Sequence, residues 1–443
     1  MKKAISFLIL LPIITAIGAQ LGVWVTPLLV IASVYVVTVL VAKDKIKGKE
    51  LYFYLYAIAL SLVWQTTMMG QDVVGSDIHT ELYYARYNQE HFWDISYPDS
   101  SNTSFVVGLL SPMLATILKW DMVWVFKIIL PLFLACVPII LFQMYKGIFG
   151  EKRAYFASIF FMIIPVYSME IAQIAKSMVA EACLAVVFYA LVNDWKQWIK
   201  LGMIIVFLTL AILAHYTVGI IGICFLLGLF IYRLITQWWK WELVENRKTH
   251  LLVILSSLVL CIGVFWGYHG YAANGSAVRS VKEVVANYIP SADVKAIEVK
   301  QTNTDVPIVK EEGIEEKPIL SKSLTQSLPD RMAEAPRLVK IGTGFDFMEV
   351  PIEGKIFRLI QYLTQALILI GVVWIIFAYK KHNYPSEYVG LVGCACVLLL
   401  LCVFFPSLSG IVNMTRVYHY SLFAIAPMFV VVVEYITGKV WHE

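Results

Sequence analysis

Long apolar runs separated by short polar segments dominate the chain. A membrane-spanning helix needs about 20 mostly apolar residues, and runs of that kind lie at roughly 4–19, 22–42, 51–69, 122–145, 154–168, 171–193, 200–214, 216–235, 250–270, 354–379, 386–405 and 415–437. The pattern predicts an all-α polytopic membrane protein with about twelve transmembrane helices. A further apolar run at 104–118 is shorter and contains Pro112, so we expect an outer juxtamembrane helix there, interfacial or re-entrant, rather than a span.

The lysines and arginines assign the loops to two sides. Short loops rich in these residues stay in the cytoplasm, and with the N-terminus there the inner loops are 43–50, 146–153, 194–200, 236–249 and 380–385. Both termini are then cytoplasmic. A full span at 104–118 would split the basic loops between the two faces, which argues against it.

The same assignment divides the chain into four regions. We expect an N-terminal transmembrane hairpin at 1–50, a catalytic membrane module at 51–270 with a first outer loop at 70–121, and a C-terminal three-helix segment at 354–443. Between them, 271–353 forms a long extracytoplasmic loop or a small cap, with one amphipathic helix predicted near 277–289.

Composition supports this class. Apolar residues make up 60% of the chain and charged residues 15%, with a mean hydropathy of +0.74, whereas soluble domains carry about 25% charged residues. The net charge of +4 gives no indication of nucleic-acid binding. All seven cysteines lie in apolar runs, which favours small buried side chains over disulfides or metal ligands.

Ionisable residues near the predicted outer membrane edge are the candidates for chemistry. The segment GSDIHTELYYARY at 75–87 places Asp77 and Glu81 four residues apart, on one face of a helix, with His79 off that face. Ser76 or Asp77 could cap that helix. The two carboxylates are the candidate catalytic residues, as general base or metal ligands. A solvated helix start is the alternative.

A second group lies at 168–192, around the predicted outer end of a span. Glu170 and Gln173 share a helical face, and Lys176 lies three residues further along it. Lys176 could also be a snorkelling lysine. Glu181 lies about two turns into the span, where an ionisable group is costly, so we expect an interhelical partner for it.

Two smaller groups complete the set. His215 and Tyr216 fall at an outer turn between two spans, and Arg416 begins the last span with His419 on the same face. A guanidinium binds phosphate in a bidentate way, although interface anchoring also explains Arg416. Together the groups suit attack on a phosphate-linked donor held in the bilayer, with the acceptor in outside water.

The order of these segments resembles the GT-C class of integral-membrane glycosyltransferases. The aspartate that opens the first outer loop is followed by a proline-containing helix (LLSPMLATIL, 109–118), a basic turn (IFGEKRA, 148–154) and a span ending at Pro165. Within that class the chain is most similar to a largely archaeal, uncharacterised membrane-protein family with segments of the type D-I-H-x-E-Y-Y-x-A, A-R-Q-x-I-A-E-L and S-H-Y-S. The chain has DIHTELYYA at 77–85, AKSMVAE at 175–181 and AHYT at 214–217, so Lys176 and Ser177 replace that family's arginine and glutamine.

The resemblance implies a polyprenyl-phosphate- or polyprenyl-diphosphate-linked sugar as donor and a glycan, protein or lipid as acceptor. Asp77 would be the catalytic aspartate, and Lys176 and Arg416 would hold the lipid phosphate. The remaining candidates would line the substrate pocket: His79, Glu81, Glu170, Glu181, His215, Tyr216 and His419. Some members of the class use a divalent metal, and Asp77, Glu81 and Glu170 could supply oxygen ligands for Mg²⁺ or Mn²⁺.

Three other interpretations stay open. An O-antigen ligase or polymerase also has a long late outer loop, but 271–353 contains no histidine. A transporter or flippase of lipid-linked glycans would bury charge near the bilayer midplane, and a non-catalytic scaffold would not need these charges at one level. The N-x-S/T triplets at Asn102, Asn274 and Asn413 fall on the predicted outer side, and the first two are candidates for glycosylation.

Overall fold

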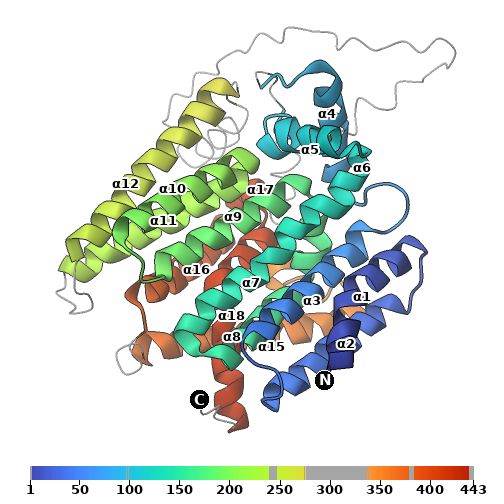
Figure 1. The fold of residues 1–443 in the computed structure, drawn as a ribbon. Helices are drawn as coiled ribbons and strands as arrows, with labels where there is room; N and C mark the ends of the chain where they lie inside the picture. Colours follow the sequence, from blue (N-terminus) through green and yellow to red (C-terminus); the bar gives the residue numbers. More distant parts are fainter. Residues whose placement is uncertain are drawn as a thin grey trace, which may run out of the picture.

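The structure is a bundle of long helices, shown in Figure 1. The computed structural model describes residues 2–95, 97, 99–238, 247–273, 275, 337, 339–378 and 384–438. Throughout these ranges every regular element is helical, which confirms the all-α prediction for the described part of the chain. The predicted amphipathic helix at 277–289 and most of the predicted outer loop at 271–353 lie outside the described residues.

Eight helices of the described ranges are long and apolar enough to cross a membrane. They are Met122–Phe149, Ala175–Val192, Gln197–Ala214, Tyr216–Trp238, Leu251–Ala272, Ile352–Phe377, Ser386–Phe404 and Met414–Thr437. A ninth span is reached if Glu151–Ile163 and Val166–Gln173, which meet at a bend of 51°, are one broken span. The protein is therefore polytopic, and the described ranges contain fewer helices of this length and hydropathy than the twelve spans expected.

The three N-terminal runs account for the difference. They form helices α1 (Lys2–Gln20), α2 (Thr26–Ala42) and α3 (Lys49–Thr67). Helix α2 has only 17 residues, and the apolar part of α1 whose side chains are described is Leu10–Gln20. Helix α3 has 19 residues, but Lys49, Glu50, Gln65 and three tyrosines lower its hydropathy.

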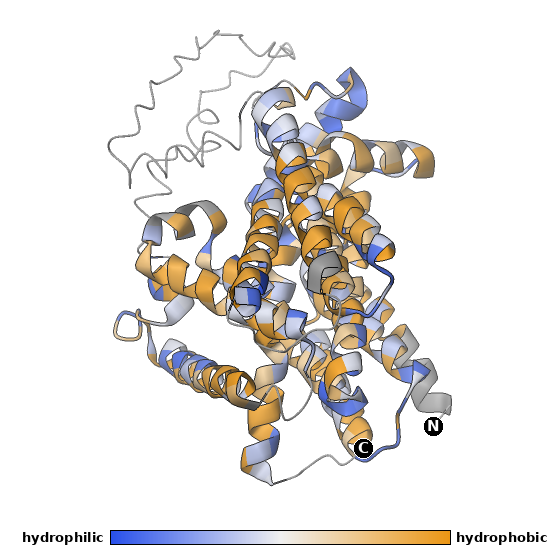
Figure 2. Ribbon diagram, turned by 90° about the vertical axis from the view of Figure 1, so that its left-hand side faces the viewer, coloured by the Kyte–Doolittle hydropathy of each residue, from blue (hydrophilic) through white to orange (hydrophobic). Residues whose placement is uncertain are grey.

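The core of the bundle forms around α7 (Leu130–Phe149) and α18 (Met414–Thr437). Helix α6 (Met122–Trp124) and the π-helical turn η2 (Val125–Ile129) continue into α7, which packs against α3, α8 (Glu151–Ile163) and α9 (Ala175–Val192). Helix α18 packs against α8, α15 (Ile352–Ala378) and α16 (Ser386–Phe404), and α17 (Pro406–Val412) precedes it. Helices α10 (Gln197–Ala214) and α11 (Tyr216–Trp238) pack beside α9, and α11 also packs against α16. Helix α12 (Arg247–Phe265), which continues into η5 (Trp266–Ala272), packs against α10 and α11. Figure 2 shows that these long helices are mostly hydrophobic along their length.

The two ends of the bundle differ. Both chain termini lie at the lower end in Figure 1, whereas α4 (Asp77–His91) and α5 (Ser111–Leu118) lie at the upper end. This is the relative arrangement that the basic loops predicted. The π-helical turn η1 (Val106–Leu110) and α5 together form an apolar helix of Val106–Leu118, which is too short for a span, as expected for the 104–118 run.

The segment around Glu170 differs from the sequence prediction, which placed Glu170, Gln173 and Lys176 along one helical face. Instead the π-helical turn η3 (Val166–Glu170) and the 3-10 turn η4 (Ile171–Gln173) form a separate helical segment that ends at an extended Ile174. Because α9 begins only at Ala175, the helical face expected to continue from Glu170 to Lys176 does not exist.

The loop before η1 is held by Asn102. This side chain is only 3% exposed, donates to the Asp94 carbonyl oxygen at 2.7 Å and accepts from the Asn88 amide at 3.0 Å. A glycan cannot be attached to an amide nitrogen that is buried and donating to the backbone. The expectation that Asn102 is open to glycosylation is therefore wrong for the folded protein, and Asn274 lies outside the described residues.

Candidate functional site

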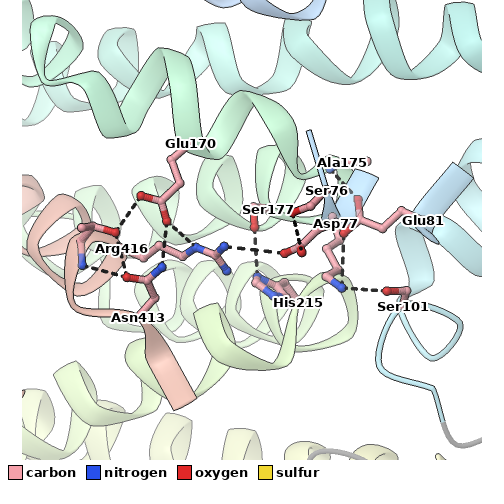
Figure 3. Close-up of polar contacts among 12 residues, drawn as sticks. Ser76, Asp77, Glu81, Ser101, Glu170, Ala175, Ser177, His215, Asn413 and Arg416 are labelled. Atoms are coloured by element: carbon pink, nitrogen blue, oxygen red, sulfur yellow. Dashed lines mark hydrogen bonds and ion pairs between the residues drawn. The ribbon is translucent and has the colours of Figure 1, made fainter. Parts of the chain in front are cut away.

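Charged side chains gather at the upper end of the bundle, where α4, η3, α9 and the start of α18 meet (Figure 3). Helix α4 begins at Asp77, as the sequence predicted, but its first turn has no side-chain cap. The Ser76 hydroxyl donates to the Asp77 carboxylate at 3.4 Å instead. The Asp77 side chain is 48% exposed, so its carboxylate is open to solvent.

The start of α18 fixes the second carboxylate of the site. Asn413 has a φ of 55°, a backbone conformation that asparagine tolerates better than most residues, and its side-chain oxygen accepts from the Thr415 N–H at 3.1 Å. This caps the helix. The Glu170 carboxylate, from the end of η3, accepts from the Asn413 amide at 3.1 Å and from the Thr415 hydroxyl at 2.7 Å.

Arg416 joins this cluster to the start of α4. Its Nε donates to Glu170 at 2.8 Å, and its Nη2 lies 3.7 Å from the Asp77 carboxylate. The Arg416 side chain is 18% exposed. The guanidinium of α18 thus lies between the Asp77 carboxylate of α4 and the Glu170 carboxylate of η3, and the Asp77 carboxylate faces solvent.

The other two charges of this region form a buried pair. The Glu81 side chain is 0% exposed and that of Lys176 is 7% exposed, with 3.3 Å between carboxylate and ammonium. Glu81 also accepts from the backbone N–H of Ala175 at 2.7 Å, and Lys176 donates to the Ser101 hydroxyl at 3.2 Å. Burial raises the pKa of the Glu81 carboxyl, while the positive charge of Lys176 acts in the opposite direction. Glu81 therefore caps α9 and ties α4 to it.

A serine and a histidine lie next to this pair. The Ser177 hydroxyl is 3.1 Å from Nδ1 of His215, and both side chains are buried. His215 occupies the extended break between α10 and α11. Burial holds the pKa of His215 well below its usual value, and the nearby charges of Lys176 and Arg416 add to this. Burial therefore favours the neutral form of His215, which acts here as a hydrogen-bonding group.

A second ionisable pair lies deeper, between α9 and α18. Nε2 of His419 is 2.8 Å from the Glu181 carboxylate, and both side chains are fully buried. This confirms that Glu181 has an interhelical partner. The second carboxylate oxygen of Glu181 and Nδ1 of His419 have no hydrogen-bond partner among the described residues.

The structure brings some of the predicted site residues into contact with one another and places the others apart. Asp77, Glu170 and Arg416 form one network, and Glu81, Lys176 and His215 lie beside it (Figure 3). Glu181 and His419 form the separate, deeper pair. Tyr216 contributes ring contacts to His215 and His269, and His79 is exposed on α4.

The carboxylates proposed as metal ligands have separate partners. Glu81 pairs with Lys176, and Glu170 accepts three hydrogen bonds from the start of α18. Among the described residues no group of three or more histidine, cysteine, aspartate and glutamate side chains could hold a metal ion. Asp77, Glu81 and Glu170 as arranged here do not form a shared site for Mg²⁺ or Mn²⁺.

Sequence reasoning missed three residues of this region. Asn413 and Thr415 carry the contacts to Glu170, and the N-x-T spacing before an apolar helix is a capping signal that could have revealed them. The third is Lys127, which is 1% exposed and donates to the carbonyl oxygens of Met69, Gly70 and Asp72 at 3.1, 2.7 and 2.9 Å. A lone lysine inside an apolar run is costly and marks such a contact.

Comparison with known proteins adds a class and no activity. Residues 347–442 match the model of the family DUF2206, described as a predicted membrane protein. The match covers less than a quarter of the chain and includes α16, α18 and Arg416 but not Asp77. No curated protein and no solved structure matches the chain. The fold and this match together define a polytopic membrane protein.

Proposed function

We propose that the protein is a membrane glycosyltransferase of the GT-C type. It would move a sugar from a polyprenyl-phosphate-type donor to an acceptor on the extracytoplasmic face. The observation that carries this proposal is the solvent-exposed Asp77 carboxylate 3.7 Å from the Arg416 guanidinium. An accessible base beside a fixed cation, next to apolar spans, is what transfer from a membrane-held phosphate donor requires.

The chemistry follows from the two charges. The acceptor hydroxyl oxygen attacks the anomeric carbon of the donor sugar, and the bond from that carbon to the phosphate oxygen breaks. The acceptor proton passes to the Asp77 carboxylate. The lipid phosphate leaves with the bonding electron pair, and Arg416 stabilises its charge, since a fixed guanidinium needs little rearrangement when that charge develops.

Lys176 and Glu81 have a positioning role in this proposal. The sequence suggested that Lys176 holds phosphate and that Glu81 is catalytic, but both side chains are buried and paired with each other. Because Glu81 accepts the first amide of α9 while lying one turn after Asp77 on α4, the pair sets the position of Asp77 relative to α9. Neither side chain touches the reacting atoms.

The upper end of the bundle is assigned to the outside by the positive-inside rule. The basic turn between α7 and α8 (Lys146, Lys152 and Arg153) lies at the opposite end from α4, with the two termini. The site is then extracytoplasmic, in the cell membrane, and its acceptor is a glycan, protein or lipid of the cell envelope.

The test replaces the proposed base. Asp77→Asn keeps the size of the side chain and removes its basicity, and loss of a general base lowers the rate by about 10²–10⁴-fold. Glu90→Gln is the matched control, because Glu90 is an exposed carboxylate on the same helix. Glycan and glycoprotein profiles of the source cell are compared for the two variants. Unchanged glycans with well-folded Asp77→Asn protein would end the base assignment.

The buried Glu181–His419 pair favours a second candidate, a transporter or flippase of lipid-linked glycans. Ionisable side chains within membrane helices commonly belong to substrate or proton pathways, and this pair is fully buried between α9 and α18. Movement of a lipid-linked glycan across vesicles by purified protein, lost in Glu181→Gln but kept in Asp77→Asn, would support it. The ligase or polymerase alternative depends on 271–353, most of which is outside the described residues.

A further inference from the structure

Three side-chain donors converge on one carboxylate at the start of α18. The Asn413 amide, the Thr415 hydroxyl and Nε of Arg416 all donate to Glu170, at 3.1, 2.7 and 2.8 Å (Figure 3). Glu170 comes from a different segment, 246 residues before Arg416 in the chain. An amide, a hydroxyl and a guanidinium are also the groups that proteins use to bind phosphate oxygens.

We propose that Asn413, Thr415 and Arg416 form a phosphate subsite, and that Glu170 occupies it as an internal competitor until a phosphate-bearing substrate displaces it. The proposal rests on the function proposed above and adds two residues and a regulatory contact to it. The ligand class is a phosphate mono- or diester, such as the headgroup of a polyprenyl phosphate.

The charge balance of the cluster favours competition between Glu170 and phosphate over simultaneous binding of both. The cluster holds two cations, Arg416 and Lys176, and three carboxylates, Asp77, Glu81 and Glu170. The balance is therefore two positive against three negative charges before any substrate arrives. A phosphate that entered with Glu170 in place would add negative charge to a net negative site. Departure of the Glu170 side chain brings the cluster to neutrality and frees three donors.

The local backbone permits this departure. Glu170 lies in the short η3–η4 segment, which is bounded by extended residues at Ile164 and Ile174. Such residues at element ends absorb changes in φ and ψ, so the segment can shift without unwinding α8 or α9. The Glu170 side chain is also 28% exposed, which gives it a way out toward solvent.

The alternative hypothesis, that Glu170 only positions Arg416, predicts the opposite change in phosphate affinity when Glu170 is replaced. If Glu170 only positions Arg416, removing it disorders the guanidinium and weakens phosphate binding. If Glu170 competes with phosphate, removing it strengthens binding. The apparent affinity of an occupied site falls in proportion to the fraction of molecules in which it is free. With Glu170 in place in about nine molecules of ten, Glu170→Ala tightens phosphate binding about tenfold.

The experiment measures phosphate affinity directly. Full-length protein in nanodiscs is titrated with undecaprenyl phosphate and, in a separate arm, with inorganic phosphate, which distinguishes a lipid headgroup from a free anion. Glu170→Gln is measured beside Glu170→Ala, because its near-isosteric side chain preserves packing if the alanine variant is unstable. Thr415→Val should weaken binding, and Thr437→Val, at the far end of the same helix, is its matched control.

The subsite is supported if Glu170→Ala or Glu170→Gln binds phosphate more tightly, and if Thr415→Val binds it more weakly while Thr437→Val does not. Weaker binding by both glutamate variants, or no phosphate binding by any variant, overturns it. Because binding is measured without sugar transfer, the result is independent of the Asp77 test. A subsite that binds in a protein without transferase activity would leave this inference standing while the proposed function fails.

Discussion

Replacing Lys176 by methionine should destabilise the protein through the carboxylate it leaves behind. Methionine matches the length of the lysine stem but carries no charge, so Glu81 remains fully buried without its ionic partner. At 3.3 Å the attraction is about 5 kcal/mol for an effective dielectric constant near 20. Measured losses on breaking buried pairs are about 3–5 kcal/mol, and we expect a loss in that range.

The loss should depend on pH. Glu81 already has a raised pKa in the folded protein because of burial, and removing Lys176 raises it further. The folded state then binds more protons than the unfolded state, so stability falls as pH rises above the unfolded value of about 4.3. Lys176→Met should therefore regain part of its lost stability when the pH is lowered from 7.5 to 5.

The assay is denaturant unfolding of purified protein in detergent at the two pH values. Lys49→Met, which removes an exposed lysine at the start of α3, is the control and should change little. The double variant Glu81→Gln with Lys176→Met leaves no buried charge and should recover most of the loss. An equal loss at both pH values, or no loss relative to Lys49→Met, would refute the reasoning.

Three further outcomes are expected. Lys127→Met deprives three carbonyl oxygens of their shared donor, so amide exchange in 69–77 should accelerate and stability should fall by about 1–3 kcal/mol; unchanged exchange would argue against a role in holding the segment before α4. His419→Phe leaves Glu181 buried and unpaired, and should lower stability by about 3 kcal/mol, with recovery when Glu181→Gln is added; no recovery would mean that packing, not charge, causes the loss. Peptide mass spectrometry of protein from a glycosylating host should find Asn102 unmodified, because its amide is buried and donating, and a glycan there would contradict the loop structure.

The sequence indicates local helices well because the signals are local. Asp77 and Glu81 lie on a helix, as their four-residue spacing suggested, and the short apolar run at 104–118 forms a helix too short to span. The sequence does not indicate that Glu81 is buried while Asp77 is exposed. That difference arises because α9 packs beside α4 and its first amide needs an acceptor.

The contacts that build the site are long-range, and this limits prediction from sequence. The sequence predicts Glu170 and Lys176 on one helix face. Because the helix is broken at Ile174, Glu170 instead pairs with Arg416 of α18 and Lys176 pairs with Glu81. Arg416 could be recognised as a cation at the edge of the last span. Its partner lies 246 residues earlier, and no periodicity in a single sequence connects the two.

The most direct measurement is a cryo-electron microscopy map of the full-length protein in nanodiscs with bound undecaprenyl phosphate. The proposed function predicts phosphate density against the Arg416 guanidinium, with the Asp77 carboxylate facing the same opening. Density for the phosphate at the opposite end of the bundle, or anywhere that leaves Arg416 and Asp77 without contact to the ligand, would contradict the proposed transfer site.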